Sequence, residues 1–309
     1  MSSREPVIKH TVEPRIIDLG GFSIRRSMPT RATRSVGPWV FFDHFGAHTF
    51  PAGNGADVIP HPHINLATVT YLFEGALEHR DSIGTVETIR PRAVDLMIAG
   101  AGIVHSERTP VSRRRRDHRL HGLQLWHALP ADHEEDAPSF HHSPAEAIPG
   151  VDVDGVATRV MIGSAYGVSS PVPTFAQTLY VEAQLAAGRR FDLPRDVPEL
   201  AVYIVQGSAL LVPGAASEGA DELAEHHFYV LSSADAGEVI TSEEGCRLVL
   251  IGGENLGKRY MYWNFVSSRK ERIDNARQAW EADSMGVIPG DEDERAPLPA
   301  FDSHARLSD

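Results

Sequence analysis

Two closely spaced pairs of candidate metal ligands constrain this chain more than any other feature. His61 and His63 flank a proline, and His105 and Glu107 flank a serine. In a β-strand, side chains two positions apart point to the same face of the sheet. If both pairs lie on strands that face one cavity, three imidazoles and one carboxylate converge on a point. Three nitrogens and one oxygen suit a divalent transition metal such as iron, and they leave octahedral positions open.

The residues around these pairs favour strands. Residues 66–73 are rich in β-branched and aromatic side chains and end at a Glu74-Gly75 turn. Residues 94–98 are apolar, and a glycine turn at 99–102 leads into His105. Pro62 lacks a donor for the ladder, which costs little on an edge strand. An isolated histidine is more often a surface residue, and we expect the adjacent pairs His141-His142 and His226-His227 to be surface pairs.

The second half of the chain echoes the first. Residues 70–76, TYLFEGA, resemble residues 202–208, VYIVQGS. Counting back equally from each glycine places His61-Pro62-His63 on Leu193-Pro194-Arg195, so the proline is retained and both histidines are replaced. This pattern predicts a second copy of the same fold without a metal centre. The alternative is an unrelated β-domain.

Composition bounds the function. The 309 residues allow two domains, and the net charge of −13 argues against direct nucleic-acid binding. The run Arg113–Arg116 is interpreted as a solvated loop. We expect no membrane span and no signal peptide in residues 1–14. A single cysteine, Cys246, excludes an internal disulfide and favours a cytoplasmic location.

The predicted organisation is an all-β protein with a C-terminal helix. We expect an N-terminal metal-binding domain at 15–130, a linker at 131–155, a second, metal-free domain at 156–265, and a helix with an irregular tail at 266–309. Ser268 and Glu271 have capping-box spacing, and a helical face is predicted from the spacing of Ile273, Ala276, Ala279 and Trp280.

The segment from Pro60 to Glu107 resembles the pirin family within the cupin superfamily. The similarity lies in Pro60–His63, Thr68–Leu72, His79–Gly84 and Ala99–Glu107, with Gly122–Trp126 fitting further on. It extends more weakly over most of the chain. The resemblance implies two tandem cupin barrels (double-stranded β-helix or jelly-roll folds), with iron only in the first. It also implies that the metal ligands are His61, His63, His105 and Glu107.

Some positions depart from the cupin pattern. The usual cupin carboxylate would fall on Ala67 or Thr68, which are poor ligands, so Glu107 must supply the oxygen, as in pirins. Two positions where glycine is common hold Asn65 and Arg92. Asn65 can adopt a positive φ, whereas we expect Arg92 to resist it.

The resemblance gives two functional hypotheses. Some pirins cleave flavonols such as quercetin with dioxygen, which predicts a non-haem Fe(II) dioxygenase in which Glu107 acts as both ligand and general base. Other pirins bind transcription factors or metabolic enzymes, which predicts a metal- and redox-dependent regulatory protein without turnover. A sugar-phosphate isomerase is a third, weaker hypothesis, because the sequence shows no phosphate-cradling loop. Spacing does not distinguish iron from nickel, manganese or copper, and a closed zinc site is less favoured.

Further polar and aromatic residues accompany the ligand pairs. His79 and Asp81 are spaced two apart, and we favour an exposed pair at a strand end over partners of the ligands. Gln124 and Trp126 share one strand face beside His127. They either line the pocket or belong to the core.

Overall fold

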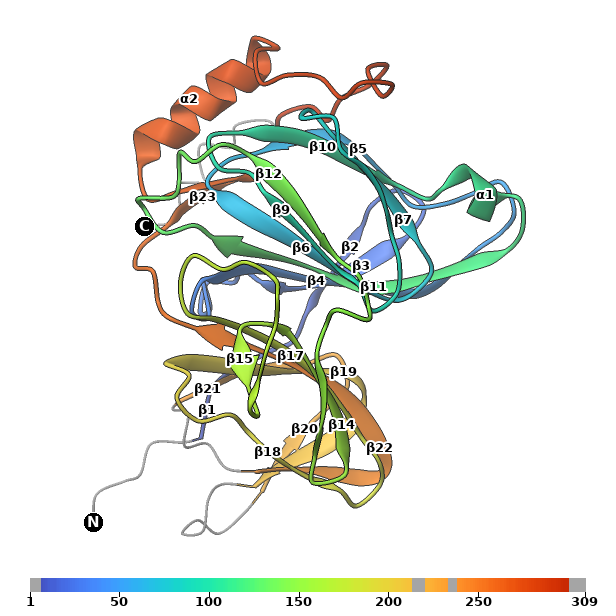
Figure 1. Ribbon diagram of the computed structural model, residues 1–309, viewed down its shortest axis with the longest axis vertical. Coiled ribbons are helices and arrows are strands. Elements are labelled where there is room, and N and C mark those ends of the chain that lie inside the picture. Colours follow the sequence, from blue (N-terminus) through green and yellow to red (C-terminus); the bar gives the residue numbers. More distant parts are fainter. Residues whose placement is uncertain (1–6, 213–219, 233–237, 300–309) are drawn as a thin grey trace. The chain divides into compact units, whose positions relative to one another are not determined.

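The computed structural model describes residues 7–212, 220–232 and 238–299. The chain forms two compact units (Figure 1). Unit 1 comprises Met1–Ile17, Arg25–Asp43 and Glu146–Asn255, and unit 2 comprises Asp18–Ile24, His44–Ala145 and Leu256–Asp309. Both units are therefore discontinuous in the sequence. The boundaries proposed from the sequence at 130, 155 and 265 stay predictions for the sequence domains.

Unit 2 holds the two sheets that contain the ligand-bearing segment. A four-stranded antiparallel sheet has the order β5 (Asp57–His63), β10 (Ile103–Arg108), β7 (Leu77–Asp81) and β8 (Val86–Ile89). A seven-stranded sheet has the order β12 (Ser139–Ser143), β9 (Val94–Ile98), β6 (Leu66–Glu74), β11 (His118–Ala128), β4 (Trp39–Phe50), β3 (Ser23–Met28) and β2 (Arg15–Asp18). The residues of β2, β3 and β4 are divided between the units.

Shorter elements complete unit 2. They are the helix α1 (Val111–Arg114), the hairpin of β23 (Tyr260–Tyr262) and β24 (Phe265–Ser267), and the helix α2 (Lys270–Glu281). The helix α1 contains part of the arginine run, which is half-buried or exposed. The segment predicted as a linker supplies β12 to this unit.

Unit 1 is built on a nine-stranded sheet. Its order is β1 (Ile8–Val12), β21 (Phe228–Leu231), β19 (Glu199–Val212), β22 (Glu238–Gly253), β17 (Thr178–Leu185), β14 (Val156–Ile162) and β13 (Gly150–Val153), with β18 (Arg190–Asp192) paired to β22 and β20 (Asp221–Leu223) paired to β19. A small hairpin joins β15 (Ser164–Ala165) to β16 (Val168–Ser169). The fold is mostly β, with one long C-terminal helix, as predicted.

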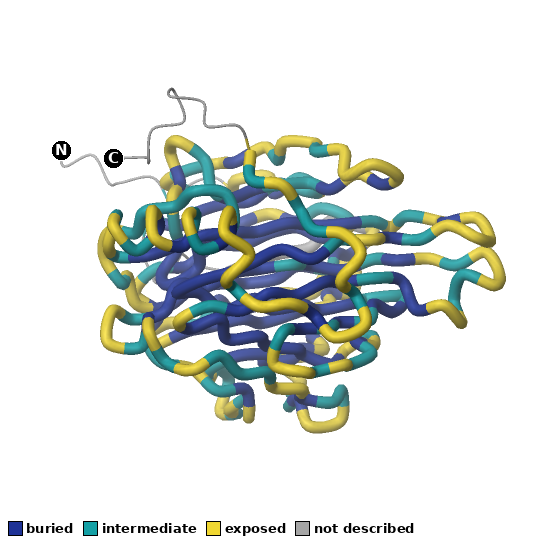
Figure 2. The backbone as a smooth tube through the Cα atoms, turned by 90° about the horizontal axis from the view of Figure 1, so that it is seen from above, coloured by how far each residue is buried: buried dark blue, intermediate teal, exposed yellow. Residues whose placement is uncertain are grey.

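Each unit has an apolar core of its own. Figure 2 shows that buried positions follow the strands, whereas exposed positions gather in the connections. The core of unit 1 includes Leu193, the residue that the repeat aligns with His61. Arg195, which the repeat aligns with His63, is exposed. An apolar side chain therefore occupies in unit 1 the position that holds a buried imidazole in unit 2.

No helix among the described residues is long and apolar enough to cross a membrane.

The C-terminal helix α2 packs through the predicted face but does not begin as predicted. Ile273, Ala276 and Trp280 are buried, and they cluster with Ile64 and Val104 of the ligand-bearing region. The predicted capping box is wrong, because the N-cap residue is Arg269 and makes no side-chain capping hydrogen bond.

The acceptor that replaces the capping box is a distant carboxylate. The backbone N–H and the hydroxyl of Ser268 both donate to the buried carboxylate of Glu134, at 2.6 and 3.0 Å. A residue far away in the sequence therefore holds the start of the helix.

Asn65 and Arg92 both have a positive φ, at two turns where cupins often have glycine. Asn65 has a φ of 58°, as expected. Arg92 has a φ of 71°, so the expectation that it would resist this conformation is wrong. The Arg92 N–H donates to the carbonyl of Leu72 at 2.9 Å and the Ala93 N–H to that of Arg90 at 3.3 Å. These hydrogen bonds offset the free-energy cost of the left-handed backbone conformation, which is about 1–2 kcal/mol for a residue with a side chain.

The turn after β6 generates a test of this architecture. Gly75 has a φ of +97°, and a Cβ added there would lie 2.4 Å from the carbonyl oxygen of Arg119. Gly84 has nearly the same φ, +94°, but open space around it. We expect Gly75→Ala to lower the free energy of unfolding by about 3 kcal/mol, combining conformational strain and overpacking, and Gly84→Ala by about 1 kcal/mol. Urea denaturation measures both, and equal losses would contradict the close approach at Gly75.

Candidate metal centre

The two pairs of candidate ligands lie on neighbouring antiparallel strands. β5 carries His61 and His63, β10 carries His105 and Glu107, and His61 lies opposite His105 in the ladder. β5 is the edge strand of its sheet, which is why Pro62 is tolerated between two candidate ligands. The strand context inferred from spacing is confirmed.

Three imidazoles come together between these strands. The ring centroids of His61 and His105 are 4.3 Å apart, and His63 lies 5.0 Å from each of them. One ring nitrogen from each lies within 4.8 Å of the other two, and all three side chains are buried. This spacing allows the three nitrogens to share one ion.

Glu107 is buried beside this cluster but is not one of its three members. The register of β5 and β10 shifts after His105, so that Glu107 lies opposite Val58. The structure thus brings together the three predicted histidines and places the predicted carboxylate next along β10. Its role as a fourth ligand stays a prediction.

In His61 and His63, Nδ1 is the outer ring nitrogen and makes a hydrogen bond away from the cluster, which leaves Nε2 as the inner nitrogen that faces the other imidazoles. Nδ1 of His61 lies 2.9 Å from the carbonyl oxygen of Ile59, and Nδ1 of His63 lies 3.0 Å from that of Asn264. A carbonyl only accepts, so each Nδ1 must carry the proton and each Nε2 presents a lone pair. Such outer partners commonly fix the tautomer of a histidine ligand.

His105 provides the test of whether a metal fits. Its Nε2 is buried and makes no hydrogen bond to any described residue. Orphaned buried polar atoms are rare because they carry the full cost of desolvation. A divalent cation shared by the three Nε2 atoms would satisfy this nitrogen, so the donor set fits a transition metal.

The charge state of the histidines also suits a metal. Burial lowers the pKa of His61 to about 4. Burial and the neighbouring His61 place the pKa values of His63 and His105 well below their usual range. All three imidazoles are therefore neutral near pH 7, which is the form that binds metal ions.

Glu107 is held in a polar corner of the cavity. Burial raises its pKa, while His79 and Thr70 oppose that rise. The Thr70 hydroxyl lies 3.2 Å from Oε1 of Glu107 and 2.8 Å from Oε1 of Gln124. One hydroxyl proton serves only one of these oxygens at a time, so Thr70 links the two side chains.

One wall of the cluster is aromatic. The Trp126 ring lies 4.9 Å from that of His63 in an edge-on arrangement. Trp126 is buried, and Gln124 reaches Thr70 from the same strand. Gln124 and Trp126 therefore belong to the surroundings of the site, while His127 is a buried residue whose pKa burial lowers to about 4.

His79 and Asp81 are not exposed, so the favoured interpretation of this pair is wrong. Both are buried on β7, whose residues pair with those of β10. His79 Nε2 lies 3.0 Å from Asp81 Oδ2, and His79 Nδ1 lies 3.4 Å from His105 Nδ1. The exposed turn lies beyond them, and the pair stands directly behind a candidate ligand.

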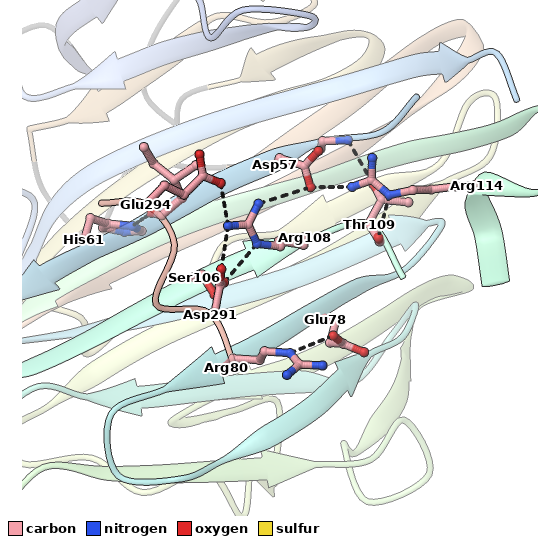
Figure 3. A network of polar contacts seen from close by, with 12 residues as sticks. Asp57, His61, Glu78, Arg80, Ser106, Arg108, Thr109, Arg114, Asp291 and Glu294 are labelled. Atoms are coloured by element: carbon pink, nitrogen blue, oxygen red, sulfur yellow. Dashed lines mark hydrogen bonds and ion pairs between the residues drawn. The ribbon is translucent and has the colours of Figure 1, made fainter. Parts of the chain in front are cut away.

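The C-terminal tail reaches the strand that carries His105. The Ser106 hydroxyl donates to Asp291 Oδ2 at 2.6 Å, and Arg108 donates to both oxygens of Asp291 at 2.9 and 2.7 Å (Figure 3). Arg108 also donates to Glu294 at 2.8 Å. These ion pairs raise the pKa of Arg108. The described part of the tail, up to residue 299, has no helix or strand after α2, and it is tied to the residues on both sides of Glu107.

The same tail also reaches β5. The N–H of Ala296 donates to the carbonyl of Pro60, next to His61, at 2.8 Å. The acidic run at 291–294 was the only sequence signal of these contacts. Nothing in the sequence indicated that Asn264 would orient His63.

Known proteins share this sequence and fold. Residues 21–127 match the family model described as Pirin, and residues 180–286 match the Pirin C-terminal cupin domain. The chain belongs to the pirin family. It is 42% identical to a pirin-like protein from Caulobacter vibrioides, over 91% of this chain and 96% of that protein. It is 30% identical to the pirin of Homo sapiens, over 83% and 85% of the two chains.

A solved structure is also similar to this pirin-family chain. The crystal structure of a quercetin 2,3-dioxygenase from Acinetobacter baumannii superposes with a TM-score of 0.85 at 34% identity, covering 97% of this chain and 98% of that one. The resemblance found in the motifs from Pro60 to Glu107 is therefore confirmed along nearly the whole chain.

The tail contacts predict a specific loss of stability. We expect Asp291→Ala to lower the free energy of unfolding by about 1–2 kcal/mol, because charge-assisted bonds to Ser106 and Arg108 are lost at a partly exposed site. The matched control is Asp293→Ala, which removes an exposed carboxylate of the same tail. Thermal and urea unfolding compare the two, and an equal effect would contradict an anchoring role for Asp291.

Proposed function

We propose that this protein is a metal-dependent dioxygenase that uses O2 to cleave a flavonol of the quercetin type. The observation that carries the proposal is the convergence of three buried, neutral histidines with an orphaned Nε2 among them. The similarity to a quercetin 2,3-dioxygenase supports the choice of substrate class.

The ion would be held by Nε2 of His61, His63 and His105, with the Glu107 carboxylate as the fourth ligand. We favour Fe(II), while nickel, manganese, copper and zinc suit overlapping donor sets. When bound, such an ion supplies a Lewis acid and an electron-transfer centre that relieve the spin barrier between dioxygen and an organic molecule. The second cupin domain, with Leu193 and Arg195 at the aligned positions, is proposed to bind no metal.

Glu107 is the proposed catalytic residue. Burial raises its pKa, so its carboxylate is a stronger base than an exposed one. It would accept the proton of the substrate hydroxyl, while Thr70, which also contacts Gln124, would hold the carboxylate in place. Trp126 offers a flat apolar surface to an aromatic substrate.

The alternative is a regulatory protein whose metal and redox state control binding to a transcription factor or a metabolic enzyme. Two features favour this alternative. The net charge is −13, and the contact between Asp291 and Ser106 connects the acidic C-terminal tail to β10, the strand that carries His105. Capture of a partner that differs between Fe(II) and Fe(III) protein, without oxygen consumption, distinguishes it from the enzyme. In either case we propose a cytoplasmic protein, consistent with the single Cys246 and its lack of a disulfide partner in the chain.

Metal retention tests the ligand set. We expect His63→Ala to lose the bound metal, because the remaining donors no longer enclose the ion. The control is His141→Ala, which removes an exposed histidine. Metal content after gel filtration is measured by mass spectrometry, and a normal content in His63→Ala would reject this residue as a ligand.

Oxygen uptake tests the reaction. We expect Fe(II)-reconstituted protein to consume O2 stoichiometrically with added quercetin, and His61→Ala to consume none above background. Uptake is followed with an oxygen electrode. No uptake by protein with confirmed iron would reject the flavonol dioxygenase and favour the regulatory alternative.

A further inference from the structure

The outer nitrogen of His105 has a different kind of partner from the outer nitrogens of His61 and His63. The outer nitrogens of His61 and His63 face backbone carbonyls, which accept hydrogen bonds whatever the side chains around them. The outer nitrogen of His105 faces another imidazole, that of His79, at 3.4 Å. A neutral imidazole can donate or accept at this nitrogen, so its role depends on its other partner.

Asp81 decides what His79 does. A carboxylate is acceptor-only, so the 3.0 Å contact between Asp81 Oδ2 and His79 Nε2 places the His79 proton on Nε2. In the neutral ring, Nδ1 is then an acceptor aimed at His105. The other oxygen of Asp81 is held by the backbone N–H groups of Ile83 and Thr85, at 3.1 and 2.9 Å.

The His79 ring is also fixed in place. It stacks on Phe140 with centroids 4.5 Å apart and is buried. If His105 carried its proton on Nε2, two lone pairs would face each other between buried rings, and an N–H would point at the other two ligands. A proton on His105 Nδ1 avoids both and leaves Nε2 free, which agrees with the orphaned Nε2 in the cluster.

We propose that Asp81 and His79 are positioning residues that set the tautomer of His105, in a relay from Asp81 through His79 to His105. The proposal rests on the metal binding proposed above and extends it to residues that touch no metal. Among the three histidine ligands, His105 is then the one whose donor atom is set by side chains and is open to change by substitution.

Asp81→Asn is the decisive variant. The amide oxygen must stay on the backbone N–H groups of Ile83 and Thr85, so the amide NH2 faces His79 Nε2. His79 then accepts at Nε2 and carries its proton on Nδ1, which reverses the relay and places the His105 proton on Nε2. We expect affinity for Ni(II), measured by competition with a chelator, to fall by about 10- to 100-fold.

A double-mutant cycle separates this relay from a general structural role. His79→Phe keeps a ring against Phe140 but removes the acceptor, and we expect a similar loss of affinity. In the His79→Phe background, Asp81→Asn should cause no further loss, since Asp81 acts through His79. The control is Asp152→Asn, which alters an Asp that caps the N–H of Gly155 in another turn, at 2.7 Å, and should leave affinity unchanged.

The tautomer is measured directly in metal-free protein. The 15N shifts of the two His105 ring nitrogens, assigned by comparison with His105→Gln, should show Nδ1–H in the natural protein and Nε2–H in Asp81→Asn. An unchanged tautomer together with unchanged Ni(II) affinity would overturn the relay. Failure of the natural protein to bind metal would reject the proposed function instead, while the tautomer measurement still decides the relay.

Discussion

The proposed metal centre depends on burying three imidazoles so that their Nε2 atoms face one another. Nδ1 of His61 and Nδ1 of His63 each donate to a backbone carbonyl, and Nδ1 of His105 faces that of His79, which leaves the three Nε2 atoms in a buried space. Burial makes the protonated forms unfavourable, so protons cannot neutralise the mutual repulsion of these lone pairs. A divalent cation bound as proposed would relieve this repulsion and satisfy the orphaned Nε2 of His105.

Much of the remaining architecture of unit 2 supports that burial. β5 is an edge strand that admits Pro62, β10 supplies His105, and β7 places His79 and Asp81 behind it. Segments distant in sequence complete the support, since Asn264 orients His63 and Asp291 binds Ser106. The ligand strands are thus held from behind by the C-terminal part of the chain, which contributes none of the three clustered histidines.

The parts of this structure that could be predicted from the sequence are those that local residue patterns determine. Spacing of two along a strand identified the clustered histidines, and the buried face of α2 followed from helical periodicity. The failures have one physical cause, which is competition from long-range contacts. Ser268 binds the distant Glu134 and so forms no capping box, and the turn at Arg92 is held by the carbonyl of Leu72. His79 looked like a surface residue because nothing local signals the strand that covers it.

The most direct test of the proposed metal centre is anomalous X-ray diffraction at the absorption edge of a metal loaded into crystals of the full chain. We expect one strong peak bounded by Nε2 of His61, His63 and His105, at about 2.1 Å from each. A fully loaded protein with its peak elsewhere, or with Nδ1 atoms facing the ion, would contradict the convergence on which the proposed chemistry depends.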